Sequence, residues 1–576
     1  NLEEEITICG WIHRRRDHGG VIFLDVRDIK GICQAVVNPD NEKSFKLAES
    51  IRNEYVVQIK GNVRNRLDGT INKNMHTGEI EIEVIDLIIL SKASTPVFPI
   101  DEYQEVNEDV RLKNRVLDLR RPEMNERIIT RSKITSLIRN YLDKNDFHEI
   151  ETPILTKATP EGARDYILPS RVQPGSFYAL PQSPQLFKQL LMIGGLDKYY
   201  QIARCFRDED LRADRQPEFT QIDIEASFIN QDKIMTISEK MIKNIIKEFC
   251  NDELEKFEVI NWHDSMRDYG CDKPDLRIPL NLVDISELVK DEEFKVFSEP
   301  ASKKGSRVVA LKVPKGNSLS RGQIDDYTKF VSKLGAKGLA YIKINDVNDL
   351  ENGIQSPILK FLKPKTIENI IKSLDIETDD LIFFGAGNES VVNLSMSSLI
   401  KKLGDDLDLY TKKWAPCWVV DFPMFETNKE GDLTPLHHPF TLPKCSKKEL
   451  EENPIGAIAH AYDVVLNGYE IGGGSLRIYD NEMQKTIFNI LNISKEDADN
   501  KFGFLLKALS SGCPPHGGIA FGLDRIVMLV TDTTNIRDVI AFPKTQSAAC
   551  LLTDAPSKVE KNQLEELKII STHKEE

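Results

Sequence analysis

The stretch CFRDEDLRADRQPEFTQID, residues 205–223, decides the fold of this chain once it is set beside two others. By itself, a charged RDED segment is typical of a solvated turn, and Arg207 alone would be a surface salt-bridge residue. Upstream, FHEIETPI (147–154) has the pattern of a helix end that runs into a strand containing a proline. Downstream, GIAFGLDR (518–525) could begin any surface helix. Each segment has an ordinary explanation, so only their combination and order carry information.

Taken in this order, the three segments resemble motifs 1, 2 and 3 of the class II aminoacyl-tRNA synthetases. Three ordered matches are much harder to obtain by chance than any one of them. Between 151 and 228 and between 414 and 543 the resemblance narrows to the bacterial aspartyl-tRNA synthetases. It rests there on CFRDEDLRADRQPEFTQID and on ATPEGARDY, LPQSPQLFKQLLM, LHHPFTLPK and GYEIGGGSLRI.

The resemblance implies activation of L-aspartate by ATP to aspartyl-adenylate, then transfer to the 3′ end of tRNA. Catalysis of such a step is mainly positioning and charge stabilisation. Arg207 would hold the α-phosphate and the amino-acid carboxylate, and Arg525 the γ-phosphate, because a planar guanidinium fork matches phosphate oxygens. Glu209 would accept a hydrogen bond from the adenine amino group, and Phe219 would stack on the ring. The other residues implied to bind ATP are Asp208, Gln216, Glu470, Gly522, Leu523 and Asp524.

Asp463 and Glu470 are implied to hold Mg²⁺, which usually takes one or two carboxylates plus substrate phosphates. Their separation of seven fits one helix face or neighbouring strand positions, so spacing alone settles nothing. The alternative for Asp463 is a local cap or ion pair.

For aspartate, the resemblance assigns the side-chain carboxylate to Lys188 and Arg477. Two cations favour aspartate over asparagine, because an amide would leave a buried positive charge underpaired. The remaining predicted contacts are Glu161, Ser183, Gln185 and Asp223 around the ammonium group, Arg207 at the α-carboxylate, and His437, with His438, over the pocket.

Residues 1–92 contain several short apolar stretches separated by turn signals, which favours a small β-barrel such as an OB-fold. CGWIHRRRDHGGVIFLDVRD (9–28) resembles the anticodon-binding domain of the family. Phe23 would stack on an anticodon base, Gln34 would read a base edge, and Arg14 to Arg16 would meet the backbone. Because VIFL is apolar throughout, Phe23 as a core residue is the alternative.

His18 and Gly69 resemble the non-discriminating subgroup, which charges both tRNA(Asp) and tRNA(Asn). The product on tRNA(Asn) would then need a tRNA-dependent amidotransferase as partner. The alternatives are a strictly tRNA(Asp)-specific enzyme, a class II amino-acid ligase that does not act on tRNA, and a non-catalytic OB module. The resemblance also implies a homodimer with motif 1 at its interface.

We therefore predict a multidomain α+β protein with an OB-fold barrel, an antiparallel-sheet catalytic domain and an inserted α+β domain. The predicted parts are 1–92 (anticodon-binding), 93–120 (linker), 121–275 and 408–543 (catalytic), 276–407 (insertion) and 544–576 (C-terminal extension). The insertion is similar to the extra domain of bacterial members, although its Gly-Ala-Asp signature here reads Gly385-Ala386-Gly387.

Composition adds broad limits. A net charge of −15 alone would argue against nucleic-acid binding, but in a multidomain chain a local basic patch decides phosphate contact. The nine cysteines form no CxxC pair, so we expect reduced thiols. The opening residues lack a signal-peptide pattern and no apolar run approaches the roughly 18 residues of a spanning helix. We expect a cytoplasmic protein without a membrane partner.

Overall fold

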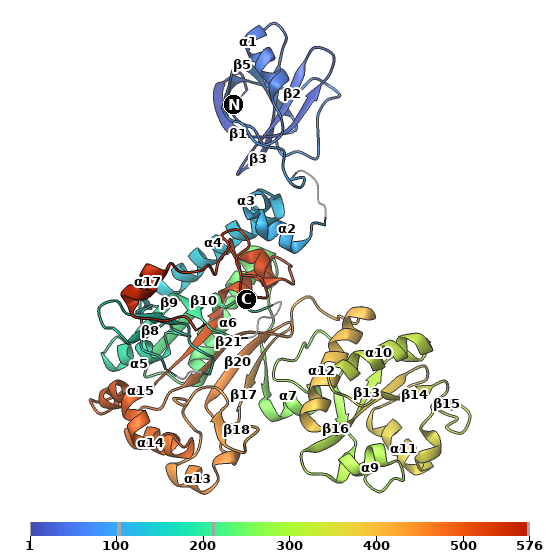
Figure 1. Ribbon diagram of the computed structural model, residues 1–576. Helices are drawn as coiled ribbons and strands as arrows, with labels where there is room; N and C mark the ends of the chain where they lie inside the picture. The colour runs from blue at the N-terminus through green and yellow to red at the C-terminus, as the bar shows by residue number, and fades with distance from the viewer. Residues whose placement is uncertain (1, 101–104, 160–161, 210–213, 573–576) are drawn as a thin grey trace. The chain divides into compact units, whose positions relative to one another are not determined.

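The computed structural model describes residues 2–100, 105–159, 162–209 and 214–572. The chain forms two compact units, drawn in Figure 1. Asn1–Ile129 and Arg537–Lys558 form the first unit, and Thr130–Ile536 and Val559–Glu576 form the second. The predicted domain boundaries do not coincide with these units, and they stay predictions.

A closed five-stranded barrel with the strand order β1-β2-β3-β5-β4 occupies the N-terminal part of the first unit. Its side chains alternate, so that Ile22 and Leu24 are fully buried in the barrel core while Phe23 between them is only half-buried. Strand β5 begins at residue 80 and places Ile82 and Val84 in the core. The elements are β1 (Glu5–Asp17), β2 (Ile22–Asp28), β3 (Gly31–Val37), α1 (Glu42–Ser50), β4 (Val56–Asn65) and β5 (Ile80–Ser91).

Short helices complete the first unit around one buried arginine. Arg115, 1% exposed, donates hydrogen bonds to the backbone carbonyls of Arg537, Ile540 and Ala541, and pairs with Asp118. These bonds fasten residues 537–541 to the helices that precede the catalytic chain. The elements are α2 (Glu108–Lys113), α3 (Arg115–Asp118), the start of α4 (Pro122–Asp143), and η4 (Ile536–Val539).

An eight-stranded sheet with the order β11-β17-β20-β21-β22-β10-β9-β6 is the centre of the second unit (Figure 1). Its pairs are antiparallel except for β11 with β17 and β6 with β9 at the two edges. The predicted antiparallel catalytic sheet is thus confirmed. The strands are β6 (His148–Glu149), β9 (Lys198–Phe206), β10 (Glu218–Ser227), β11 (Glu258–Asn261), β17 (Pro416–Val420), β20 (Ala461–Leu466), β21 (Tyr469–Leu476) and β22 (His516–Gly522).

Helices and two small hairpins surround this sheet. The helices are α5 (Gln185–Ile193), α6 (Gln231–Cys250), α7 (Trp262–Tyr269), α13 (Lys447–Glu452), η3 (Pro454–Gly456), α14 (Asn481–Ile490), α15 (Lys495–Leu509), α16 (Leu523–Val530) and α17 (Lys561–Leu567). The hairpins are β7 (Ile167–Pro169) with β8 (Phe177–Ala179), and β18 (Phe425–Thr427) with β19 (Leu433–Pro435).

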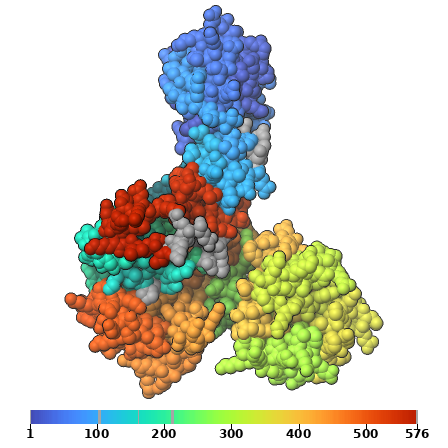
Figure 2. Space-filling model, in the orientation of Figure 1, coloured from blue at the N-terminus to red at the C-terminus, as the bar shows by residue number. Residues whose placement is uncertain are grey.

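The predicted inserted α+β domain is confirmed as a five-stranded sheet, β12-β13-β16-β14-β15, with helices around it. Strand β13 alternates between two cores, with Val309 and Leu311 in one and Val308 and Ala310 in the other, so the sheet is buried on both faces. Figure 2 shows these residues, from yellow-green to yellow, as a lobe of the second unit. The elements are β12 (Leu282–Asp284), α8 (Ser286–Val289), α9 (Lys295–Ser302), β13 (Ser306–Val313), η1 (Gly316–Ser318), α10 (Arg321–Lys333), β14 (Ala340–Ile344), β15 (Ile354–Gln355), η2 (Leu359–Phe361), α11 (Pro364–Ser373), β16 (Leu381–Asn388) and α12 (Glu389–Asp406).

Within the described ranges, no helix combines the length and the apolar character that crossing a membrane requires. All nine cysteines are free thiols. Gly385-Ala386-Gly387 lies at the end of β16 in the insertion.

Candidate active site

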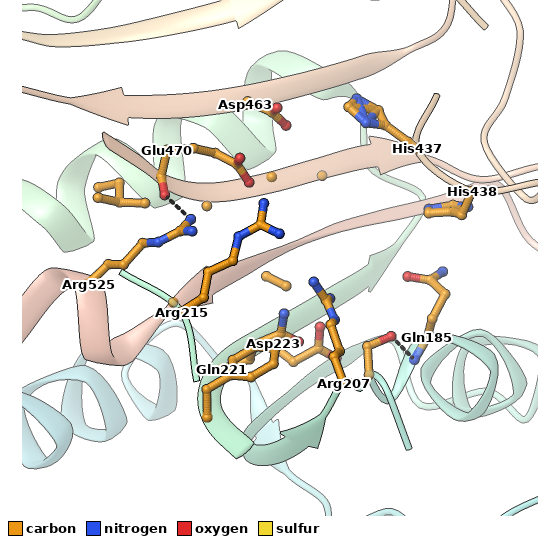
Figure 3. A pocket seen from close by; sticks show the side chains of 18 of the residues that line it. Gln185, Arg207, Arg215, Gln221, Asp223, His437, His438, Asp463, Glu470 and Arg525 are labelled. Atoms are coloured by element: carbon orange, nitrogen blue, oxygen red, sulfur yellow. Dashed lines mark hydrogen bonds between the residues drawn. The ribbon is translucent and has the colours of Figure 1, made fainter. Parts of the chain in front are cut away.

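A pocket of about 450 Å³ opens over strands β10, β21 and β22 of the large sheet. Figure 3 shows labelled side chains around it from β10, β20 and β21, from the starts of α5 and α16, and from the segments that carry Arg207, Arg215 and the two histidines. Most of the residues predicted for catalysis and aspartate binding line this pocket. They are Ser183, Gln185, Lys188, Arg207, Glu209, Gln216, Phe219, Asp223, His437, His438, Asp463, Glu470, Arg477, Gly522, Asp524 and Arg525.

Strand alternation explains why β10 supplies several of them. Phe219, Gln221 and Asp223 are two residues apart and line the pocket together. The strand beside them presents small residues, with Ala520 opposite Asp223 and Gly522 opposite Gln221. Gln221 was missed by the sequence prediction, although the period of two between Phe219 and Asp223 points to it.

Four buried charges form a cluster at the pocket, three of them in its lining and Glu225 beneath them. Lys188 Nζ lies 2.7 Å from Asp223 Oδ1 and 3.2 Å from Glu225 Oε2. Arg477 binds Glu225 with two hydrogen bonds, Nε to Oε1 at 3.0 Å and Nη2 to Oε2 at 3.1 Å. Each of these residues is at most 2% exposed. Buried charges are costly unless paired, and here two cations and two carboxylates neutralise one another.

Burial and ion pairing shift the pKa values of Asp223 and Glu225 in opposite directions. Burial raises the pKa of Asp223, although the charge of Lys188 opposes it. Burial would also raise the pKa of Glu225, but the charges of Arg477 and Lys188 outweigh it and lower that pKa. Glu225 is therefore held as a carboxylate under both cations.

Glu225 was not among the predicted site residues. It continues the pocket-facing period of β10, but it lies beneath Arg477 and Lys188 rather than in the pocket lining. Gly518 on β22 makes room for it, because a Cβ there would lie 2.0 Å from Glu225 Oε2. Only glycine at 518 fits beside this carboxylate.

Two histidines close one side of the pocket (Figure 3). His438 Nε2 lies 2.6 Å from Arg477 Nη1, so His438 must be neutral, with the lone pair of Nε2 accepting from the guanidinium. The ring of His437 packs against Phe422, with 4.6 Å between centroids. Burial lowers the pKa of His437 to about 4, the nearby Glu470 opposing and Arg477 adding to the shift.

Three buried polar atoms lining the pocket have no hydrogen-bond partner among the described residues: Asp223 Oδ2, Gln185 Nε2 and His437 Nε2. Such atoms are costly to leave unpaired. The arrangement therefore offers an acceptor and polar groups to a small polar ligand. Ser183 lies beside them, and its hydroxyl accepts from the backbone N–H of Gln185 at 3.2 Å.

The predicted phosphate-binding arginines stand at the other end of the pocket. Arg525 donates to the Glu470 carbonyl at 2.8 Å and lies 3.2 Å from Asp214 Oδ2. Arg207 stacks over the ring of Phe219, 5.1 Å from its centroid. A third arginine, Arg215, points into the same space in Figure 3 and pairs with Glu209 at 3.0 Å. Arg215 was not among the predicted site residues.

Several predicted ATP contacts occupy other positions. Leu523 is buried in the core and Asp208 lies at the surface beside Arg164, and neither lines the pocket. Asp524, 2% exposed, accepts from the Thr220 amide at 2.9 Å and pairs with Arg131, which anchors the first turn of α16. Glu161 lies outside the described residues.

Asp463 and Glu470 lie on neighbouring antiparallel strands, β20 and β21, which settles the two geometries that spacing left open. Asp272, not predicted, lines the pocket with them. Burial raises the pKa of Asp463, and Glu470 and Asp272 raise it further. Hard oxygen donors that repel one another suit a divalent cation. No set of three metal-ligating side chains occurs in the described part of the chain, so a cation here would use substrate oxygens as well.

On the barrel, Phe23 is half-buried outside the core, and its ring meets the exposed His18 edge-on at 5.6 Å. This position contradicts the core alternative for Phe23. Gln34 is 6% exposed, and its amide bonds Arg16 at 3.0 Å and Glu81 at 2.9 Å, so it would have to release a partner to contact a base.

Arg14, on the same strand as Arg16, is exposed. Gly69 sits in an exposed loop with a φ of +85°.

Comparisons with known proteins find a family for the region that carries the pocket and another for the barrel. Residues 107–546 match the family of class II tRNA synthetases (D, K and N), and residues 6–90 match an OB-fold nucleic acid binding domain. The fold is similar to the crystal structure of asparaginyl-tRNA synthetase from Pyrococcus horikoshii complexed with asparaginyl-adenylate. The TM-score is 0.57 at 19% sequence identity, over 94% of this chain and 95% of that one. At this identity the likeness concerns the fold alone.

Proposed function

This chain belongs to the class II tRNA synthetases of the D, K and N group, and on that premise we propose that its amino acid is L-aspartate. The observation that carries the proposal is that two cations, Lys188 and Arg477, line the same pocket. Both cations are buried, and the same pocket holds three buried polar atoms, on Asp223, Gln185 and His437, that have no hydrogen-bond partner among the described residues. A small acid with an ammonium group satisfies both sets.

A count of donors favours aspartate over asparagine. Lys188 has three N–H bonds, of which one donates to Asp223, and its ammonium also forms an ion pair with Glu225 at 3.2 Å. Arg477 has five and uses four, for Glu225, His438 and Ser475. At least one donor on each cation is left for a carboxylate. The amide of asparagine would turn its own N–H bonds toward one of them, which leaves buried donors unpaired.

The opposite end of the substrate meets acceptors. Asp223 Oδ2 would accept from the ammonium group, with Gln185 and Ser183 beside it. Arg207 would hold the α-carboxylate against the α-phosphate of ATP, so that its oxygen is placed for attack. Arg525 would bind the γ-phosphate, which requires it to leave Asp214. Positive charge held at the phosphates in this way stabilises the transition state.

Asp463 and Glu470 would hold Mg²⁺ at the phosphates, and the ion would supply charge neutralisation there. Their strands place both carboxylates on the pocket, and their mutual repulsion fits a cation between them. Phe219 and Glu209 would hold adenine, and Gln216 would lie beside the phosphates.

The tRNA substrates are proposed to be tRNA(Asp) and tRNA(Asn). Phe23 and the basic residues Arg14 and Arg16 support anticodon binding at the barrel, and His18 against Phe23 is placed to influence the choice of base. A tRNA-dependent amidotransferase would then complete the asparagine product. We propose a homodimer through motif 1, supported by the exposed apolar side chains of its last residue, Ile154 (40%), and of the next residue, Leu155 (56%).

Charging assays with labelled aspartate, ATP and Mg²⁺ test this proposal, with tRNA(Asp) and tRNA(Asn) in parallel. Comparable charging of both is expected. Charging of tRNA(Asp) alone would exclude the non-discriminating subgroup, and charging of neither, together with aspartate-dependent ATP cleavage, would favour an amino-acid ligase that does not act on tRNA.

A further inference from the structure

One arginine of the inserted domain forms hydrogen bonds with the end of α7. Arg307 of β13 is 6% exposed and donates to the backbone carbonyls of Met266 at 3.1 Å and Arg267 at 2.9 Å. It also donates to Asn393 Oδ1 at 2.9 Å and lies 3.3 Å from Asp284. The last carbonyls of a helix have no partner within it, and cations there are favourable. The insertion therefore caps a helix of the chain that flanks it.

Beyond α7 the chain turns directly against α12 of the insertion. Gly270 follows the helix with a φ of +68°, a conformation that favours glycine. A Cβ at this residue would lie 2.8 Å from the Asn393 carbonyl. Ser265 then donates to the Cys271 carbonyl at 2.7 Å. Residues 270 and 271 are thus fixed between α7 and the insertion.

The next residue, Asp272, reaches the ATP end of the pocket, where it lines the wall with Asp463 and Glu470. Burial raises its pKa, and Glu470 adds to the shift against the charge of Lys273. Asp275 then packs on the β20–β21 turn, 3.0 Å from where a Cβ of Gly468 would stand. One short segment therefore places a third carboxylate in the wall of the same pocket as the predicted magnesium ligands, without forming a three-ligand set with them among the described residues, and packs on the hairpin that carries them.

We propose that the inserted domain, through Arg307, positions Asp272 and thereby sets how strongly the site binds magnesium-ATP. The proposal rests on the function proposed above. Asp272 adds negative charge beside Asp463 and Glu470, which favours a divalent cation between the carboxylates and the phosphates. Arg307 acts only through α7 and is a positioning residue.

The test compares Arg307→Ala, Arg307→Lys and Asp272→Asn with Arg321→Ala, an exposed arginine of the same domain. Calorimetric titration with α,β-methylene ATP over a Mg²⁺ series measures binding without turnover. Arg307→Ala and Asp272→Asn should each need at least fivefold more Mg²⁺ for half-maximal binding, and Arg307→Lys should recover part of the loss. Arg321→Ala should match the wild type.

Two further measurements separate positioning from general damage. The KM for aspartate in pyrophosphate exchange should stay within twofold in all variants, and the double variant should bind no worse than the weaker single one, because both act on one segment. Arg307→Ala that binds magnesium-ATP like Arg321→Ala, or equal losses for aspartate and ATP, would overturn the inference. If Arg307→Ala does not fold, Asp272→Asn and Arg307→Lys still decide. A wild type that binds magnesium-ATP but shows no aspartate-dependent exchange would refute the proposed function instead.

Discussion

Glu225 shows how much of this site depends on a residue that touches no substrate in the proposal. It lies under Lys188 and Arg477, accepts two hydrogen bonds from Arg477 and forms an ion pair with Lys188, with no exposed surface. Without it, two cations would face each other with a single counter-charge. The pocket is thus a balanced set of four charges, in which each member fixes the orientation of the next.

Removing Glu225 should destabilise the second unit. Loss of one partner from a buried pair costs about 3–5 kcal/mol, because the other charge stays buried and unpaired. We expect Glu225→Ala to lower the urea midpoint of that unit's transition clearly. The control is Glu149→Ala, which breaks the largely exposed pair with Arg139 and should cost below about 1 kcal/mol. Similar midpoints for both variants would contradict a paired, buried Glu225.

His437 should make stability depend on acid pH. Its folded pKa is lowered to about 4, below the 6.5 of an unperturbed histidine, so its contribution to stability is complete above pH 6.5. As pH falls from 6.5 to about 4, the unfolded chain takes up a proton that the folded chain refuses, and this contribution is lost. The urea midpoint of the wild type should therefore fall relative to that of His437→Gln as the pH is lowered from 6.5 to about 4. A difference between the two proteins that stays constant from pH 7 to 4 would rule the effect out.

At the scale of elements, three adjacent strands build the pocket by alternation. Strand β10 presents Phe219, Gln221 and Asp223, while β22 presents Ala520 and Gly522 beside them, so that polar side chains have a floor of small residues. The register between β10 and β22 is what brings motif 2 against motif 3.

Gly518→Ala should disturb that register. A Cβ at 518 would lie 2.0 Å from Glu225 Oε2 and 2.1 Å from the Ile224 carbonyl, and overpacking typically costs about 1–3 kcal/mol. Gly503→Ala in α15 is the matched control, since a Cβ there meets nothing within 4 Å. Alanine in a helix should stabilise it by roughly 0.5–1 kcal/mol. Thermal scans of the two variants should move in opposite directions, and a neutral Gly518→Ala would contradict the packing described.

The sequence predicted most of the elements and site residues described here, and what it did not predict has physical causes. Asp463 and Glu470 were found but not their geometry, because a separation of seven fits helix and hairpin alike. Asp272 carried no signal, since 190 residues and a whole inserted domain separate it from Asp463 along the chain. Gln34 was expected at a base edge, yet its amide is used inside the barrel by Arg16 and Glu81. Local patterns predict elements, whereas long-range pairing decides which polar groups are already satisfied.

At the scale of the whole molecule, the two units divide the chemistry. The barrel belongs to the first unit and the pocket to the second. A substitution in the barrel should therefore affect the use of tRNA, and one in the pocket the use of aspartate and ATP.

Phe23→Ala tests this division. Stacking on a base contributes about 1–3 kcal/mol, so the KM for tRNA in charging should rise about tenfold. The KM values for aspartate and ATP in pyrophosphate exchange should not change. Phe228→Ala, which removes a ring that is 75% exposed in the second unit, should leave both assays unchanged. Equal losses in charging and exchange for Phe23→Ala would show that Phe23 supports the fold rather than tRNA.

The identity of the amino acid is the central claim, and ATP–pyrophosphate exchange tests it most directly. The chain would be assayed with ATP, Mg²⁺ and, separately, aspartate, asparagine and lysine, the three amino acids of its family. We predict exchange with aspartate and at least a hundredfold lower kcat/KM with the other two, because Lys188 and Arg477 keep one donor each for a carboxylate. Preferred exchange with asparagine or lysine would contradict the assignment of this pocket.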